Sequence, residues 1–208
     1  MKKIKYIIIL IVLSGYVLTN DVFAEKGPKD PMSVGSMTLN FGIGAGIHYN
    51  SGYATGFGPG IQFAFERGMW QLGPGVLTLG GELGFSYFTF NGYYGGYHAG
   101  GIYYPDFAYK YSWLNFILAC RSAYHYGWKV PGLDTYGGIA MGFRFVSFTD
   151  TYADYYNGYY GYYAPASFGF FPGVFFGGSY FFNPVIGVNA ELGFNVNYAQ
   201  IGMIFKLK

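Results

Sequence analysis

The closing stretch of the chain, residues 177–208, carries the pattern that most constrains the fold. Every second side chain from residue 186 is apolar (Ile186, Val188, Ala190, Leu192, Phe194, Val196), and small or polar residues lie between them (Gly187, Asn189, Glu191, Gly193, Asn195). Side chains of a β-strand point alternately to opposite faces. The stretch therefore predicts a sheet with one apolar and one polar face. The class of the protein depends on which of these faces meets water.

Similar alternation recurs along the chain after residue 35. We expect strands at about 36–50, 60–69, 76–90, 109–126, 134–148 and 168–182, and two more in the closing stretch. Short turns containing Pro and Gly alternate with long connections, chiefly 91–108 and 149–167. Short turns on one rim and long loops on the other are typical of transmembrane β-barrels. The predicted fold is all-β, an eight-stranded antiparallel up-and-down transmembrane β-barrel.

The scarcity of charge indicates which face is outside. Only 11% of the residues are charged, whereas ordinary soluble domains carry roughly 25%. A face of Gly, Ala, Ser and Asn suits the interior of an eight-stranded barrel, which is just wide enough for side chains to fill it. The apolar face is then expected to meet lipid. Interfacial aromatic girdles are expected from residues near strand ends: Trp70, Trp113, Trp128, Tyr124, Tyr126 and Tyr180.

A few charged residues fall on the inward face, and we expect them to form a lumen charge network. They are Glu66, Glu82, Arg121, Arg144 and Glu191. Because pairing offsets the cost of burying a charge, a charge-neutral plug is favoured over a path for protons or solutes. Cys120, the single cysteine, excludes an internal disulfide. It is interpreted as a small apolar wall residue that faces lipid.

The N-terminus has the pattern of a secretory signal. A basic start precedes a mostly apolar run, Tyr6–Leu18, and Val22-Phe23-Ala24 suits a cleavage site. The apolar run is shorter than the roughly 20 residues that a membrane-spanning helix needs. The predicted organisation is a signal peptide at 1–24, a periplasmic linker at 25–35 and the barrel at 36–208. Without residues 1–24, nine basic and nine acidic residues remain, so we expect no nucleic-acid binding.

The residues that could carry chemistry do not form a known motif. His48, His98 and His125 are too scattered for a metal site. Ser122 and His125 are close in sequence, but alternation places them on opposite faces, and the Gly-x-Ser-x-Gly pattern is absent. We therefore expect no catalytic residue, no metal and no cofactor. The alternatives are a lipid-modifying outer-membrane enzyme and a small-solute pore.

Two connections, 91–106 and 149–165, are dense in Tyr and Gly. Tyr supplies a large amphipathic contact area at low entropic cost, as the binding loops of antibodies do. The candidate contact residues are Tyr93, Tyr94, Tyr97, Tyr103, Tyr104, Tyr155, Tyr156, Tyr159 and Tyr160. One hypothesis is surface adhesion or ligand capture. The other is that these segments only extend the barrel above the membrane and form its interfacial girdle.

Gly-rich strand motifs run through the chain: Tyr136-Gly137-Gly138 with Gly142, GGELGFS at 80–86, and NAELGF at 189–194 followed by Ile201-Gly202-Met203. These motifs resemble the small outer-membrane β-barrel family that includes outer membrane proteins A and X, in versions common in the Bacteroidota. The resemblance implies a non-enzymatic protein of the bacterial outer membrane. Its expected partners are outer-membrane lipid, the barrel assembly machinery and an extracellular ligand or host surface, and we expect a monomer. Ser179 stands where many relatives carry an inward Arg, and the chain ends on Leu207-Lys208 where relatives often end on an aromatic residue.

Overall fold

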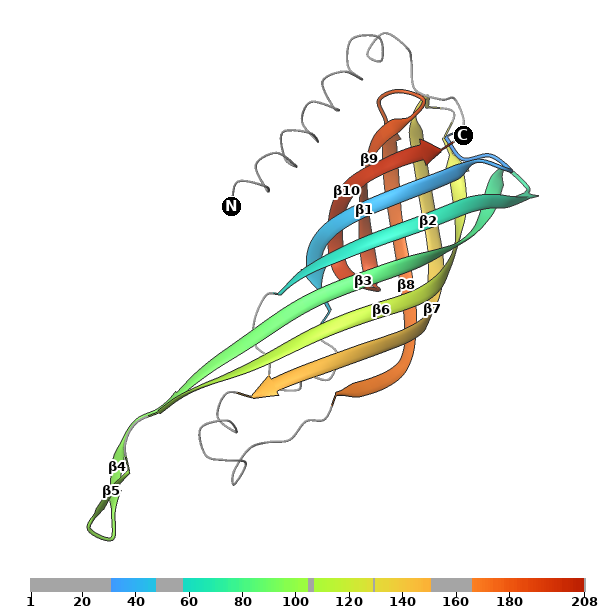
Figure 1. Ribbon diagram of the computed structural model, residues 1–208. Helices are drawn as coiled ribbons and strands as arrows, with labels where there is room; N and C mark the ends of the chain where they lie inside the picture. The colour runs from blue at the N-terminus through green and yellow to red at the C-terminus, as the bar shows by residue number, and fades with distance from the viewer. Residues whose placement is uncertain (1–30, 48–57, 105–106, 129, 151–165, 208) are drawn as a thin grey trace, which may run out of the picture.

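A computed structural model describes residues 31–47, 58–104, 107–128, 130–150 and 166–207 (Figure 1). Eight strands form a closed barrel: β1 Met37–Gly46, β2 Pro59–Leu72, β3 Gly75–Tyr94, β6 Phe107–Gly127, β7 Leu133–Asp150, β8 Ser167–Phe181, β9 Ile186–Phe194 and β10 Asn197–Leu207. Each strand pairs antiparallel with its neighbours, and β1 closes the ring on β10 from Met37↔Leu207 to Gly46↔Asn197. The predicted eight-stranded up-and-down barrel is confirmed. No helix in this part of the chain is long and apolar enough to cross a membrane.

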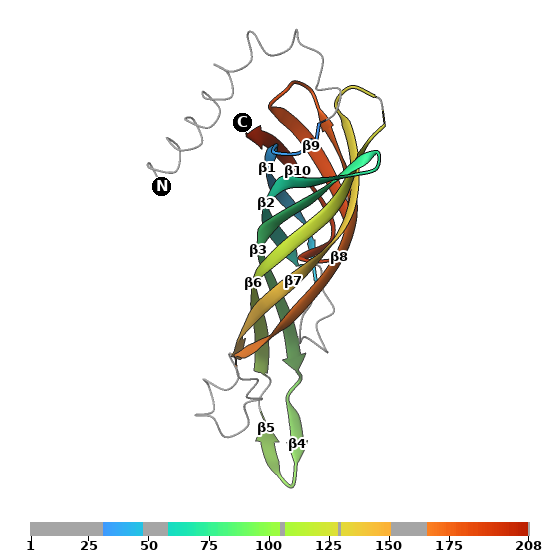
Figure 2. The ribbon, with the colours of Figure 1, turned by 90° about the vertical axis from the view of Figure 1, so that its right-hand side faces the viewer.

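The wall is higher on one side than on the other. β3 and β6 have 20 and 21 residues, whereas β9 and β10 have 9 and 11. Pairing of β2 with β3 ends at Gly60↔Ser86, but pairing of β3 with β6 continues to Tyr94↔Phe107. Pairing of β6 with β7 ends at Tyr111↔Asp150, and past this point β3 and β6 continue as a two-stranded ribbon (Figure 2). Much of the connection expected at 91–108 is thus strand, and it ends in a small hairpin of β4 (Tyr97–Ala99) and β5 (Ile102–Tyr104).

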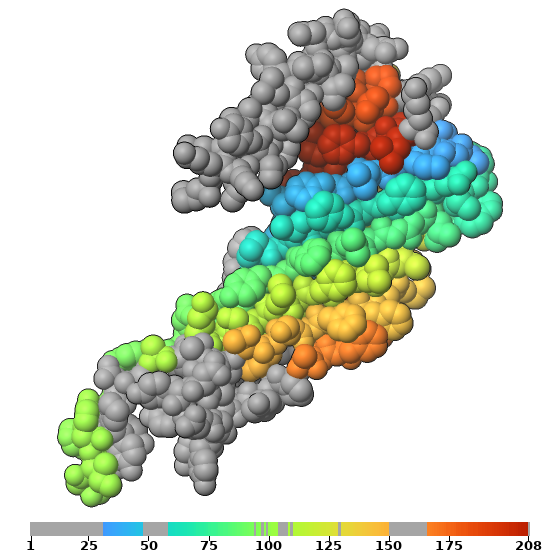
Figure 3. Space-filling view, viewed as in Figure 1, coloured from blue at the N-terminus to red at the C-terminus, as the bar shows by residue number. Residues whose placement is uncertain are grey.

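The outer wall is apolar along the strands. Leu39, Phe41 and Ile43 of β1 are 41%, 36% and 51% exposed, and the same alternation continues around the barrel. Figure 3 shows this face across β1, β2, β3 and β6. In a transmembrane barrel this apolar face is the one that meets lipid.

The aromatic girdle differs from the prediction at one residue. Trp70 and Trp128 are exposed next to the short turns, as a girdle requires. Trp113 is only 6% exposed and points into the lumen. Trp113 pairs directly with Phe88 of β3, whose side chain points into the lumen, so Trp113 lies on the inner face of β6. The prediction for Trp113 was wrong because the face of a residue was judged by its closeness to a strand end.

Two apolar residues expected on the lipid face lie inside the barrel. Ile47 is 1% exposed and Val196 is fully buried. The register of β1 against β10 shifts between Ala45 and Gly46, and such an irregularity turns the next side chain to the other face. Val196 lies in the turn between β9 and β10, where strand alternation no longer applies. The Ile47 amide donates to the Val196 carbonyl at 3.0 Å, which holds both residues at one rim.

The segment before β1 packs against the end of the barrel that carries the short turns. Met32 is 7% exposed, and the Ser36 hydroxyl lies 3.2 Å from its sulfur. The Gly35 amide donates to the Gly68 carbonyl, and the Gly68 amide donates to the Ser36 carbonyl. The end of the expected linker is therefore joined to the barrel. Residues 1–24, predicted as a signal peptide, and 25–30 lie outside the described residues.

Candidate functional site

An ion-pair cluster lies in the half of the lumen nearer the short turns, centred on Arg121 of β6. The guanidinium is 1% exposed. Its Nη2 lies 2.6 Å from Glu191 Oε2, its Nη1 lies 3.2 Å from Glu82 Oε2, and its Nε donates to Glu66. Four strands thus contribute to one cluster, since Glu66, Glu82 and Glu191 come from β2, β3 and β9. Buried charges of this kind are stable only when paired and hydrogen-bonded.

Strand register explains why Arg121 and Glu66 meet. Both residues pair with Gly80, on its two sides: Glu66↔Gly80 across β2–β3 and Gly80↔Arg121 across β3–β6. Gly80 has no side chain to separate them. A Cβ at this position would lie 1.7 Å from the Phe65 carbonyl oxygen. The glycine is therefore required by close packing, and it leaves the space that the two long side chains cross.

His125 extends the cluster toward the short turns. Its Nε2 lies 2.9 Å from Glu66 Oε2 and its Nδ1 lies 2.7 Å from Asp134 Oδ2. A ring with carboxylates at both nitrogens donates from both, which is the hydrogen-bonding pattern of the imidazolium. The Thr78 hydroxyl donates to Glu66 Oε2 at 2.7 Å. The cluster thus places four carboxyl groups around one guanidinium and one imidazole.

Amide and aromatic side chains surround the charges. The Gln62 amide donates to Glu82 Oε2 at 2.7 Å, and the Asn195 amide donates to the same oxygen at 3.1 Å. The Tyr136 hydroxyl lies 3.4 Å from Glu191 Oε2. The Arg121 guanidinium carbon sits 3.7 Å above the centre of the Phe175 ring, a cation–π contact. The guanidinium is therefore surrounded by carboxylates at its N–H groups and covered by the Phe175 ring on one face.

The lumen residues predicted from sequence are not all in one place. Glu66, Glu82, Arg121 and Glu191 meet in the cluster. Arg144 lies farther along β7: Arg121 pairs with Ala140, four residues before it, which corresponds to about 13 Å along a strand. Its half-buried side chain passes Gly169 of β8. His125 and Asp134 also belong to the cluster but were not predicted as members, although alternation places His125 on the inward face.

A second layer, made of apolar side chains, fills the lumen on the side of the long connections. Its buried members include Ile47, Phe88, Trp113, Ile117, Val146, Phe171 and Val196. Phe148 and Tyr111 pack against this layer. The ring centre of Phe148 lies 5.3 Å from that of Trp113 and 5.7 Å from that of Tyr111. The inward face was expected to be small and polar. It carries bulky side chains here, and some of them lie opposite glycines, as at Ile117↔Gly84 and Phe171↔Gly142.

Ser122, the serine considered from the sequence, does not face the cluster. The Ser122 hydroxyl donates to the Thr78 carbonyl at 2.7 Å, and both nitrogens of His125 already face carboxylates. Cys120 is exposed on the outer wall. Within the described ranges, no group of three His, Cys, Asp or Glu side chains is arranged to hold a metal ion. His98 lies in β4 with its ring 4.8 Å from that of Tyr103, and His48 lies outside the described residues.

The candidate Tyr residues lie on the ribbon where they are described. Tyr93 is 66% exposed and Tyr103 is 55% exposed. Tyr94, Tyr97 and Tyr104 belong to β3, β4 and β5. The remaining candidates lie outside the described residues: Tyr155, Tyr156, Tyr159 and Tyr160. Among the candidate contact residues, the exposed Tyr side chains that can be placed are therefore Tyr93 on the ribbon and Tyr103 in its hairpin.

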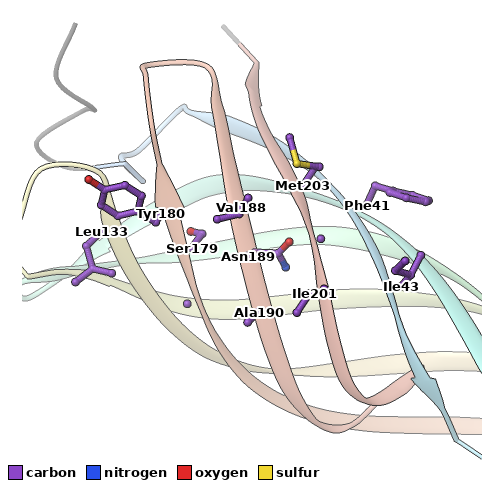
Figure 4. Close-up of a pocket in the computed structure, with 12 residues that line it drawn as sticks. Phe41, Ile43, Leu133, Ser179, Tyr180, Val188, Asn189, Ala190, Ile201 and Met203 are labelled. Carbon is purple, nitrogen blue, oxygen red and sulfur yellow. The ribbon is translucent and has the colours of Figure 1, made fainter. Parts of the chain in front are cut away.

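A hollow of about 650 Å³ lies on the outer wall, across β8, β9, β10 and β1 (Figure 4). Gly178 and Ala190 face each other in the register of β8 and β9, and their small size leaves the depression. Tyr180, Val188 and Ile201 border it. Because these side chains point away from the lumen, the hollow belongs to the lipid-facing surface and is separate from the ion-pair cluster.

No protein-family profile and no curated protein sequence matches the chain. Among solved structures, it is similar to a de novo designed transmembrane β-barrel at 15% identity and a TM-score of 0.42, over 85% of this chain and 98% of that one. It is also similar to Ail, the attachment invasion locus protein of Yersinia pestis, in a structure in complex with the heparin analogue sucrose octasulfate. The identity is 8% and the TM-score 0.37, over 84% of this chain and 96% of that one. Ail in a phospholipid bilayer nanodisc has 9% identity and a TM-score of 0.35, over 83% and 99%.

Proposed function

We propose that this protein is a non-enzymatic barrel of the bacterial outer membrane that makes surface contacts through its Tyr-rich extracellular side. The observation that carries the proposal is the β3–β6 ribbon. The pairing of β3 with β6 continues for eight residue pairs beyond the last pair of β3 with β2. The end with the short turns would face the periplasm, and the ribbon would project outside the cell. Adhesion or ligand capture is the role that such a projection serves.

The filled lumen supports a structural role for the barrel interior. The ion-pair cluster occupies one half, with Arg121 and Glu82 only 1% and 2% exposed. Apolar side chains occupy the other half, where Phe171 and Val196 are fully buried. Interiors packed in this way hold the wall together and exclude solute. The lumen therefore favours a plug over a pore.

The ribbon supports a binding role by its composition. From Tyr87 to Tyr94, β3 continues its pairing with β6 beyond its last described pair with β2. Tyr93 adds an exposed ring to this ribbon. Large amphipathic rings on a paired backbone are suited to protein or glycan contact.

The experiment is a binding assay with ribbon variants. Replacing residues 95–106 with a short Gly-Ser turn should reduce binding to cells, extracellular matrix or glycan, and so should deletion of residues 152–163 in a separate variant. Both variants should keep the heat-dependent gel mobility shift of a folded barrel, which serves as the control. If both variants are folded and bind as well as the parent protein, the proposed function is wrong.

A further inference from the structure

The hairpin at the end of the ribbon forms a two-stranded sheet that is separate from the sheet of the barrel. β4 and β5 pair through Tyr97↔Tyr104, His98↔Tyr103 and Ala99↔Ile102. Gly100 and Gly101 turn the chain with φ of +59° and +79°, as a two-residue hairpin turn of the primed type requires. Figures 1 and 2 both show the hairpin beyond the barrel, along the direction in which the ribbon leaves it.

The hairpin has no acidic or basic side chain other than His98, and it exposes a large aliphatic side chain, Ile102. Residues 91–104 contain no Asp, Glu, Lys or Arg. Ile102 is 60% exposed and Tyr103 is 55% exposed, and the two are neighbours directly after the turn. Isolated two-stranded hairpins are marginally stable in water, and these strands have three residues each. The hairpin therefore gains stability from a medium that covers its apolar side chains.

The chemistry of the hairpin fits the interfacial layer of a lipid bilayer. Tyr is enriched at the headgroup level of membranes, because its ring is apolar and its hydroxyl is polar. Pairing within the hairpin satisfies backbone groups, which lowers the cost of removing them from water. Binding of this kind scales with the buried apolar area, here headed by Ile102. Without Lys or Arg in 91–104, the hairpin has no preference for anionic lipid.

We propose that the β4–β5 hairpin inserts Ile102 and Tyr103 into the headgroup layer of a second, neutral phospholipid bilayer that faces the membrane holding the barrel. This inference rests on the proposed function and names its partner as a lipid surface. The hairpin is the anchor, and the β3–β6 ribbon is the spacer that carries it away from the barrel. A protein or glycan partner at the hairpin is the competing outcome of the test.

The test uses the full chain in nanodiscs and a separate population of phosphatidylcholine vesicles that is separated by flotation. The parent protein should float with the vesicles. The double variant Ile102→Ser/Tyr103→Ser should bind about tenfold more weakly, as expected from the loss of two buried apolar groups. The matched control Val185→Ser removes a 51%-exposed apolar side chain from the turn at the opposite end of the barrel and should bind like the parent. Adding phosphatidylglycerol to the vesicles should change binding less than twofold.

A reporter variant tests insertion itself. Ile102→Trp should show a blue shift of the added tryptophan emission when vesicles are present, because the indole leaves water. A parent protein that does not float, a double variant that floats equally well, or an unshifted emission overturns the inference. If the vesicle result is negative while the 95–106 replacement still abolishes binding to matrix or glycan, the hairpin partner is a macromolecule and the proposed function stands. If the replacement also leaves matrix, glycan and cell binding unchanged, the contribution of the ribbon to the proposed function fails as well.

Discussion

Arg121 and Glu191 meet inside the barrel with 2.6 Å between Nη2 and Oε2, although 70 residues separate them in the chain. Glu66 and Glu82 complete the coordination of the guanidinium from two other strands. The pair therefore links β6 and β9 across the lumen, while backbone pairing links each strand only to its neighbours. This cross-lumen contact makes the interior charge network a determinant of barrel stability.

Replacing Arg121 with Ala should destabilise the barrel without opening it. Removal of one partner of a buried ion pair leaves uncompensated charge, which costs about 3–5 kcal/mol. Urea unfolding in detergent, followed by tryptophan fluorescence, measures the change. Arg144→Ala is the matched control in the same lumen, and it should cost less because Arg144 is only half-buried. A stable conductance of the parent or of Arg121→Ala in planar bilayers would contradict the plug.

The His125–Asp134 contact should behave as a coupled pair. His125→Leu and Asp134→Ala should each destabilise the barrel, because each leaves a buried polar group without the partner found at 2.7 Å. The double variant should lose less than the sum of the two, with a coupling free energy of about 0.5–3 kcal/mol. A double-mutant cycle by equilibrium unfolding measures this coupling. Strict additivity would show that the contact contributes nothing to stability.

Phe171 and Phe170 provide a test of the apolar layer, since they are sequence neighbours on opposite faces of β8. Phe171 is fully buried in the lumen, and Phe170 is 59% exposed on the outer wall. Phe171→Ala should destabilise the barrel by about 3–5 kcal/mol through the cavity it leaves. Phe170→Ala should cost less, because lipid can fill the space. Equal losses of unfolding free energy would argue against a packed lumen.

Gly80 and Gly81 offer a similar comparison for close packing in β3. A Cβ at Gly80 would lie 1.7 Å from the Phe65 carbonyl oxygen, whereas the nearest atom to a Cβ at Gly81 is 3.5 Å away. Gly80→Ala should therefore destabilise the barrel by at least the roughly 1–3 kcal/mol typical of overpacking. Gly81→Ala should fold like the parent. The fraction of protein that shows the heat-dependent mobility shift after refolding reports both results, and a fully folded Gly80→Ala would disprove the packing argument.

Much of the fold follows from local alternation, because the period of two depends only on the geometry of an extended backbone. Alternation placed Leu39 and Phe41 outside and Glu66 and Arg121 inside, as the structure shows. It failed at Ile47, where a register shift reverses the face, and at Val196, which belongs to a turn. Those exceptions depend on how β1 meets β10, which are separated by most of the chain.

The composition of the candidate site was only partly predictable for the same reason. Alternation within a strand identifies the residues that face the lumen, but it does not say which residue of one strand pairs with which residue of another. Glu66 reaches Arg121 because both pair with Gly80, and His125 lies between Glu66 and Asp134. No local sequence feature distinguishes these residues from Arg144, which was also predicted to face the lumen but lies farther along β7, away from the cluster.

The sequence alone determined that this chain forms alternating strands with an apolar outer face and too little charge for a soluble surface. Tertiary structure decided the contents of the lumen, with an ion-pair cluster around Arg121 in one half and aromatic packing around Phe171 in the other. It also decided that β3 and β6 continue past the ring and carry the β4–β5 hairpin. The physical reason is that face alternation is a property of one strand, whereas register and strand height arise only when strands pair.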